Sequence, residues 1–250
     1  MDPLTIVALV VFGAAVAAYG TVIGAGGGFV LIPGLVLLFD LDGVEAVGTG
    51  AVTLAAIGIG GARTYDRAGL VDRRAAGWFV LGSVPAAFVC GTFLAGRIDS
   101  DVLIDLLGVL LLALAGFVLF MPTRYDTSGG PRPHALRWMP VGGVAVGFLG
   151  GTFAIGGGLV TLPFIGRLRR LVPHRAAATT AATAMMSSIA SSAGHSVAGN
   201  VVWGHAAVLV PSALLGSTLG ATHAGRLSAR AVLALVAGGL VAAGVPLLLR

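Results

Sequence analysis

Charge is scarce in this chain of 250 residues. Only 10% of the residues are charged, whereas a soluble domain carries about 25%. All fifteen basic residues are arginine, and lysine is absent. Hydrophobic residues make up 57% of the sequence, so the chain lacks the polar surface that a water-soluble domain needs.

Several reactive residue types are also nearly absent. The lone cysteine, Cys90, excludes an intramolecular disulfide, and Asn200 is the sole amide side chain. The sequence contains neither a nucleotide-binding motif nor a cluster of metal ligands, so we expect no cofactor and no bound metal. No acidic residue lies deep in an apolar run, which argues against a carboxylate site for cations.

Long apolar runs dominate what remains. A helix needs about 20 apolar residues to cross a bilayer, and runs of this length recur along the chain. They predict an all-α, multi-pass protein of the cell membrane. No basic segment precedes the first run, which we interpret as a span and not as a cleaved signal. The eight runs are 4–39, 46–62, 75–96, 102–121, 138–166, 176–194, 205–223 and 231–249.

The net charge of +5 raises the question of a nucleic-acid partner. The arginines lie almost entirely in short loops between the apolar runs. Such loop arginines orient membrane proteins, because basic loops prefer the cytoplasm. We therefore predict a lipid bilayer as the surroundings of the chain and no nucleic-acid partner.

The chain contains an internal duplication. The stretch GAGGGFVLIP (24–33) returns as AIGGGLVTLP (154–163), at an offset of 130 residues. Two long copies are the duplication typical of secondary transporters. We predict a single integral membrane domain made of a first transmembrane repeat (1–121), a polar cytoplasmic linker (122–137) and a second repeat (138–250).

Loop charges indicate how the two repeats are oriented. The loop FDLDGVE (39–45) carries three acidic residues and no basic one. Its counterpart GRLRRLVPHR (166–175) carries four arginines and no acidic residue. Because basic loops prefer the cytoplasm, equivalent loops fall on opposite sides of the membrane. The repeats are therefore predicted to be inverted, with 167–175 inside and 40–45 outside together with the N-terminus.

The glycine triplets explain how an inverted repeat can arise. The run 4–39 is too long for a single span. A break at Gly26–Gly28 would turn it into a re-entrant hairpin, which gives each repeat the odd number of segments that inversion requires. Irregular backbone at membrane depth is tolerated where it lines a cavity. The alternative is that the glycines only allow close helix packing.

The triplets predict an anion site. A helix N-terminus carries about half a positive charge and free N–H groups, and two inverted copies would bring two such ends together near the midplane. The predicted substrate-binding residues in the two triplets are Gly26, Gly27, Gly28, Gly156, Gly157 and Gly158.

Hydroxyl side chains follow each triplet. Thr49 and Thr53 lie one helical turn apart, as do Thr179 and Thr183 at the equivalent positions of the second repeat. A hydroxyl can donate a hydrogen bond to an oxyanion without carrying charge, so we predict all four as substrate-binding residues. The alternative is that such hydroxyls bond to their own helix.

His195 ends the polar stripe that continues from Thr179 and Thr183. A histidine beside a transport path can take up a proton near neutral pH. His195 is therefore a candidate for coupling transport to protons. The alternative is an interfacial histidine bonded to the backbone.

The paired motifs resemble a known family. The two glycine stretches are each followed by a segment of small residues and threonines, VGTGAVTLAAIGIGG and ATTAATAMMSSIASSAG. Together they resemble the TauE/SafE sulfite exporter family, also called the toluene-sulfonate uptake permease family. The resemblance implies an integral membrane permease, usually described with eight spans, for sulfur-containing anions such as sulfite or sulfoacetate.

We therefore expect a secondary transporter for a small, sulfur-containing anion and no enzymatic activity. Its mechanism would be alternating access around the midplane site, with protons as a candidate coupling ion. An anion channel is the first alternative, since the same site would serve it. An intramembrane serine hydrolase is the second, because SSIASSAGHS (187–196) supplies serine and histidine, but no G-x-S-G stretch accompanies it.

Overall fold

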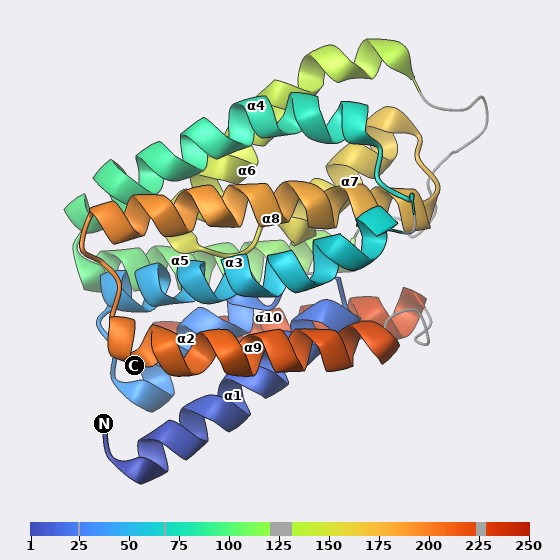
Figure 1. The fold of residues 1–250 in the computed structure, drawn as a ribbon. Coiled ribbons are helices and arrows are strands. Elements are labelled where there is room, and N and C mark those ends of the chain that lie inside the picture. Colours follow the sequence, from blue (N-terminus) through green and yellow to red (C-terminus); the bar gives the residue numbers. More distant parts are fainter. Residues whose placement is uncertain (25, 68, 121–131, 224–228) are drawn as a thin grey trace.

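The fold is a bundle of long helices (Figure 1). The computed structural model describes residues 1–24, 26–67, 69–120, 132–223 and 229–250, and these ranges contain no strand. The predicted all-α class is confirmed. The long helices are α1 (Pro3–Val22), α2 (Gly28–Phe39), α3 (Gly43–Arg67), α4 (Arg73–Val89), α5 (Ser100–Leu119), α6 (Met139–Phe153), α7 (Gly158–Arg169), α8 (Pro173–Val197), α9 (Trp203–His223) and α10 (Ala229–Leu249).

Short helices complete the described chain. A π-helical turn, η1 (Cys90–Leu94), and the 3₁₀ turn η2 (Ala95–Arg97) extend α4, and the 3₁₀ helix η3 (Pro133–Trp138) leads into α6. Most of the predicted linker 122–137 lies outside the described residues, and its last part forms η3.

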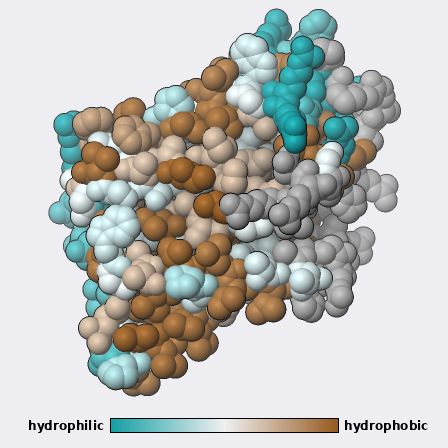
Figure 2. Space-filling model, viewed as in Figure 1, coloured by the Kyte–Doolittle hydropathy of each residue, from teal (hydrophilic) through white to brown (hydrophobic). Residues whose placement is uncertain are grey.

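Within the described ranges, five stretches of helix are long and apolar enough to cross a membrane: Pro3–Val22, Gly43–Gly60, Arg73–Arg97, Ser100–Leu119 and Ala231–Leu249. Figure 2 shows hydrophobic side chains over the middle of the molecule, with hydrophilic ones toward the left edge and the upper right. This distribution suits a bundle whose middle faces lipid.

The bundle has two ends. Both chain termini lie at one end, where α2 ends and α3 begins (Figure 1). We call this end the terminal face; it carries a salt bridge of 2.9 Å between Arg250 and Asp101. At the opposite end α7 ends at Arg169 and α8 begins (Figure 1). We call this end the Arg169 face.

Helices from the two halves of the chain pack in pairs. α1 packs on α9 and α6 on α4, while α3 lies along α8 and α5 along α10. Glycines permit the close approach. A Cβ at Gly216 or Gly220 of α9 would collide with the α1 backbone, and one at Gly143 or Gly147 of α6 would collide with the α4 backbone. Small residues at such spacing let helices meet at backbone distance.

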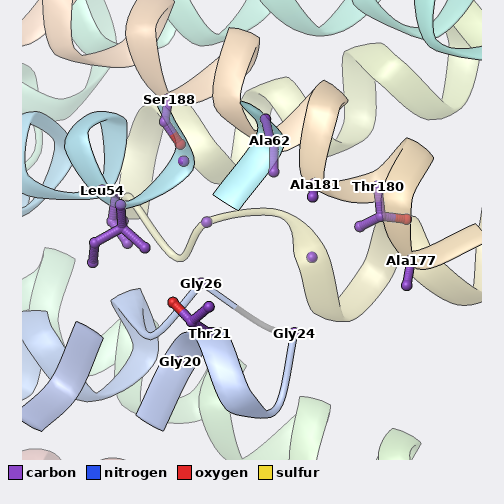
Figure 3. Close-up of a pocket in the computed structure, with 15 residues that line it drawn as sticks. Gly20, Thr21, Gly24, Gly26, Leu54, Ala62, Ala177, Thr180, Ala181 and Ser188 are labelled. Carbon is purple, nitrogen blue, oxygen red and sulfur yellow. The ribbon is translucent and has the colours of Figure 1, made fainter. Parts of the chain in front are cut away.

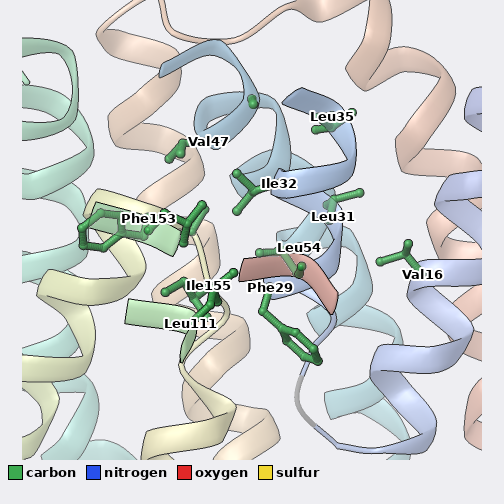
Figure 4. Packing of buried hydrophobic residues seen from close by; sticks show 14 of the residues in the cluster. Val16, Phe29, Leu31, Ile32, Leu35, Val47, Leu54, Leu111, Phe153 and Ile155 are labelled. Carbon is green, nitrogen blue, oxygen red and sulfur yellow. The ribbon is translucent and has the colours of Figure 1, made fainter. Parts of the chain in front are cut away.

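α2 lies in the core. Its sequence is apolar on every side, and Phe29, Leu31, Ile32 and Leu35 are all 0% exposed. Figure 4 shows these side chains surrounded by Val16 of α1, Leu54 of α3 and Leu111 of α5. A helix that is hydrophobic all round is expected to be buried.

Both glycine triplets interrupt helices. α1 ends at Val22 and α2 begins at Gly28, while α6 ends at Phe153 and α7 begins at Gly158. Between them Gly26 and Gly27 have φ of 82° and 80°, and Gly156 and Gly157 have φ of 79° and 49°. Side chains are strained in this left-handed region, which explains the use of glycine.

Candidate functional site

The two helix breaks lie against each other. A Cβ placed on Gly26 would lie 3.6 Å from the carbonyl oxygen of Gly156, and one placed on Gly28 would collide with the carbonyl oxygen of Ala154. The start of α2 therefore touches the segment that leads into α7. Glycine is required because backbone meets backbone here.

A cavity of about 80 Å³ lies between the breaks and the Arg169 face. Since about 10–15 Å³ holds one water molecule, this space is large enough for a small anion. Figure 3 shows it bounded by the end of α1, the two breaks, α3 and α8. The described residues that line it are all uncharged. The lining residues are Gly20, Thr21, Gly24, Gly26, Leu54, Ile57, Gly58, Ala62, Gly156, Gly158, Ala177, Thr180, Ala181, Ala184 and Ser188.

A second, smaller cavity of about 10 Å³ lies on the other side of the breaks, toward the terminal face. Leu54, Gly156, Ala184 and Ser188 line both cavities and so form the boundary between them. The other residues of the smaller cavity are Ala51, Val146, Gly150, Ala154, Gly157, Ser187 and Ser191.

The predicted glycines take different places around this space. Gly26, Gly156 and Gly158 line the larger cavity, and Gly157 lines the smaller one. Gly27 and Gly28 line neither. Gly27 precedes α2, where an added Cβ would lie 2.9 Å from the carbonyl oxygen of Val16.

The four predicted threonines are 0% exposed and line neither cavity. The hydroxyl of Thr49 accepts a hydrogen bond of 3.0 Å from Val202 N–H, just before α9. In the same way Thr179 accepts one of 2.9 Å from Asp72 N–H, just before α4. These equivalent bonds tie α3 to the start of α9 and α8 to the start of α4.

The other two threonines bond within their own helices. Thr53 donates to the carbonyl oxygen of Thr49 at 3.0 Å, and Thr183 donates to that of Thr180 at 2.9 Å. Contact of the four hydroxyls with a substrate stays a prediction.

His195 lies in the interior near the end of α8. It is 0% exposed, and its Nε2 lies 2.8 Å from the carbonyl oxygen of Gly151 in the last turn of α6. Its Nδ1 lies 3.2 Å from the side-chain nitrogen of Asn200. A neutral imidazole that donates through Nε2 and accepts at Nδ1 satisfies both contacts. Ser191 adds a hydrogen bond of 3.1 Å to the carbonyl oxygen of Gly150.

Ser191 and His195 cap the C-terminal end of α6, where the second glycine triplet interrupts the helix. The last carbonyl groups of a helix have no partner within it, and Ser191 and His195 supply partners from α8. At the equivalent end of α1, backbone N–H groups do this instead, since Gly24 and Gly26 donate to the carbonyl oxygens of Thr21 and Gly20.

A buried ion pair marks the Arg169 face. Arg169 Nη2 lies 2.7 Å from Asp72 Oδ2, and both side chains are at most 10% exposed. Arg169 also donates to the carbonyl oxygen of Arg132 at 2.7 Å. Burial alone raises the pKa of Asp72. Hydrogen bonds from Ala75 N–H and Arg169, together with the Arg169 charge, outweigh it and hold that pKa below its ordinary value.

Sequence reasoning missed this pair and one hydroxyl contact. Ser83 of α4 is 0% exposed and lies 2.8 Å from the hydroxyl of Ser187. A signal for Asp72 was present, because it is an acidic residue directly before Arg73 and Arg74 in a basic loop. Nothing in the sequence marks Ser83, because a lone serine in an apolar run is ordinary.

An apolar bundle with several possible spans among its described residues is typical of a multi-pass membrane protein. The profile of the family described as sulfite exporter TauE/SafE matches residues 9–247. The chain therefore belongs to the TauE/SafE sulfite exporter family, as the resemblance of the glycine motifs predicted.

Individual relatives agree with the class. The chain is 28% identical over 243 residues to "Probable membrane transporter protein YunE" of Bacillus subtilis, which covers 87% of this chain and 88% of the relative. It is 29% identical over 207 residues to a "Probable membrane transporter protein" of Haemophilus influenzae, covering 82% and 80%. No solved structure matches the chain significantly.

Proposed function

We propose that this protein is a secondary transporter for small, sulfur-containing anions, such as sulfite or an organosulfonate like sulfoacetate. The observation that carries the proposal is the position of the two helix breaks. Both border one uncharged cavity, which includes Gly26, Gly156 and Gly158. Membership of the sulfite exporter family supports the choice of substrate class.

The electrostatics of the breaks favour an anion. The first N–H groups of a helix have no partner in a preceding turn of that helix, and each helix start carries about half a positive charge. At α2 and α7 three of these groups donate to the glycine turns: Val30 N–H to the carbonyl oxygen of Gly27, and Gly158 and Val160 N–H to those of Gly156 and Gly157. The opposing carbonyl groups at the ends of α1 and α6 accept hydrogen bonds from Gly24, Gly26, Ser191 and His195. We therefore propose that the positive helix starts favour the anion, with Gly158 at the start of α7 lining the cavity directly and the start of α2 acting through its partial charge.

An inverted repeat with re-entrant α2 and α7 accounts for the packing. Under the offset of 130 residues, the pair α1–α9 corresponds to the pair α6–α4, and both pairs are present. The equivalent hydrogen bonds of Thr49 and Thr179 agree with the same relation. The equivalent loops 40–45 and 167–175 lie at opposite ends of the bundle (Figure 1), as inversion requires.

The two cavities support alternating access. Most residues of the smaller cavity are the 130-residue equivalents of residues in the larger one; Gly20 corresponds to Gly150, and Leu54 to Ala184. The cavity on the side of the Arg169 face has a volume of about 80 Å³ and the one on the side of the terminal face about 10 Å³. We interpret them as one site, expanded toward the first face and contracted toward the second. If the two repeats exchanged their conformations, the larger cavity would lie toward the terminal face and the smaller one toward the Arg169 face. This difference favours a carrier over an open anion channel.

The deciding experiment is counterflow in proteoliposomes with sulfite, sulfate, sulfoacetate and taurine. We expect saturable exchange of sulfite or an organosulfonate, and no exchange with the protein-free control. Uptake that increases linearly with concentration would indicate a channel. Failure of all four compounds to exchange would reject the proposed substrate class.

Proton coupling through His195 is tested in the same vesicles. A pH gradient should drive accumulation in the wild type. His195→Gln keeps a donor near the Gly151 carbonyl oxygen but cannot titrate, so exchange should persist while gradient-driven accumulation is lost. Accumulation that is unchanged in this variant would exclude His195 as the proton carrier.

A further inference from the structure

We propose that Ser188 is the hydroxyl that holds the anion at the boundary between the two cavities, so that it contacts the substrate in both access states. The proposal rests on the transport function proposed above and adds a specific residue to it. Ser188 lines the larger and the smaller cavity alike. Figure 3 shows its hydroxyl directed toward the chain that leads into α7.

The hydrogen bonds of its neighbours single out Ser188. Ser187 bonds to Ser83 and to the carbonyl oxygen of Thr183, and Ser191 donates to the carbonyl oxygen of Gly150. The hydroxyl of Ser188 makes no hydrogen bond to any other described residue, although Ser188 lies between Ser187 and Ser191 on α8. A hydroxyl at a cavity wall with no protein partner is available to a ligand.

The other three boundary residues cannot replace it. Leu54 and Ala184 have apolar side chains, and Gly156 offers backbone alone. The equivalent of Ser188 in the first repeat is Gly58, where an added Cβ would lie 3.0 Å from the Cα of Met185. A side chain with a matching hydroxyl at this position would therefore need α3 and α8 to move slightly apart. One donor serves both sides of the boundary.

The two helices that form the walls of the larger cavity around Ser188, α3 and α8, contribute different kinds of side chain. α3 contributes Leu54, Ile57 and Ala62 to the larger cavity, whereas α8 contributes Thr180 and Ser188. Thr180 is 2% exposed, and its hydroxyl has no hydrogen-bond partner in the described structure. An oxyanion would thus find its side-chain donors on α8, beside the start of α7.

The first test is kinetic. Ser188→Ala should raise the concentration of sulfoacetate needed for half-maximal counterflow by about tenfold or more, because a hydrogen bond to a charged group is lost. Ser192→Ala is the matched control; it makes the same change one turn further along α8, outside both cavities. Ser188→Thr, which retains the hydroxyl, should restore the affinity in part. Equal affinities of the two alanine variants would overturn the proposal.

The second test needs no known substrate. Ser188→Cys in a Cys90→Ser background is treated with a membrane-impermeant thiosulfonate in sealed vesicles of each orientation. The Ser188→Cys protein should react from both faces, and faster from the Arg169 face, where the cavity is larger. Thr180→Cys, which lines the larger cavity alone, should react from the Arg169 face only. Reaction of the Ser188→Cys protein from one face only would overturn the boundary position.

The two tests separate this inference from the proposed function. Labelling from both faces without counterflow of any tested anion would reject the substrate class and leave the boundary position standing. Counterflow in the wild type with an unaffected Ser188→Ala variant would reject the role of Ser188 and leave the transport function standing.

Discussion

Gly27 shows how one residue can fix the shape of the site. Its φ of 80° is unfavourable for any side chain, and an added Cβ would lie 2.9 Å from the carbonyl oxygen of Val16 and 3.3 Å from the Cα of Gly20. Both effects act on the turn that joins Gly26, which lines the larger cavity, to the start of α2. A substitution here should therefore move the helix start relative to Gly156.

We predict that Gly27→Ala lowers the stability by about 1 kcal/mol from backbone strain alone, with a further loss from the contact with Val16, and that it impairs transport. Thermal unfolding in detergent and counterflow measure the two effects. The control is Gly116→Ala in α5, where an added Cβ meets nothing within 4 Å; it should raise the unfolding temperature slightly. A Gly27→Ala protein that melts higher and transports normally would contradict the broken-helix site.

The paired threonines act at a distance from the cavity. Thr49→Val removes the acceptor of the part-buried N–H group of Val202, and Thr179→Val removes that of the buried N–H group of Asp72. We expect each to lower the free energy of unfolding by about 1–3 kcal/mol, whereas Thr→Ser at the same positions should cost less. Binding measured on the folded fraction then tests the predicted substrate contact: if it weakens much more than the stability does, the threonines touch the anion directly.

At the scale of helices, the interruption of α1–α2 and of α6–α7 at the glycine triplets follows from the length of the run 4–39 and from three consecutive glycines. The exact residues at which these helices begin and end do not follow from the sequence, because they depend on residues in the left-handed region and on close contacts in the folded protein. Ala154, for example, takes a φ of 46° after α6, and no sequence rule places an alanine there. The residues that line the cavities could not be predicted from the sequence either, since they depend on which faces of α3 and α8 meet.

The Asp72–Arg169 pair joins the end of α7 to the start of α4 and gives the Arg169 face a pH-dependent contact. The pKa of Asp72 is lower in the folded protein than its ordinary value of 3.8. Its contribution to stability is therefore present above pH 3.8 and is lost as the pH falls through the lower, folded pKa. We predict that unfolding temperature drops in this acidic window.

Asp72→Asn tests that prediction, with Asp101→Asn as its control. Asp72→Asn leaves a buried arginine unpaired and should cost about 3–5 kcal/mol at neutral pH, while flattening the acid dependence. Asp101 is 86% exposed in its pair with Arg250, so its replacement should change little. Equal unfolding temperatures for both variants at neutral pH would show that the buried pair does not stabilise the protein.

At the scale of the whole molecule, composition and loop charge predicted a membrane bundle, and the duplication predicted corresponding segments in both halves. The pairing of α1 with α9 and of α6 with α4 could not be read from the sequence. It depends on backbone contacts at Gly216, Gly220, Gly143 and Gly147, and forty glycines in the chain offer many such surfaces. The difference in size between the two cavities is likewise a property of one conformation and not of the sequence.

The orientation in the membrane is the last prediction. The acidic loop 40–45 should face outward and the arginine-rich loop 167–175 inward, because basic loops are retained in the cytoplasm. Single cysteines at the exposed Glu45 and Arg175, in the Cys90→Ser background, report this in intact and permeabilised cells. Glu45→Cys should react with an impermeant reagent in intact cells, and Arg175→Cys only after permeabilisation. Asp101→Cys and Arg137→Cys repeat the measurement at the terminal and Arg169 faces. Reaction of both loops from the same side would exclude inverted repeats, and with them the exchange of conformations on which alternating access depends.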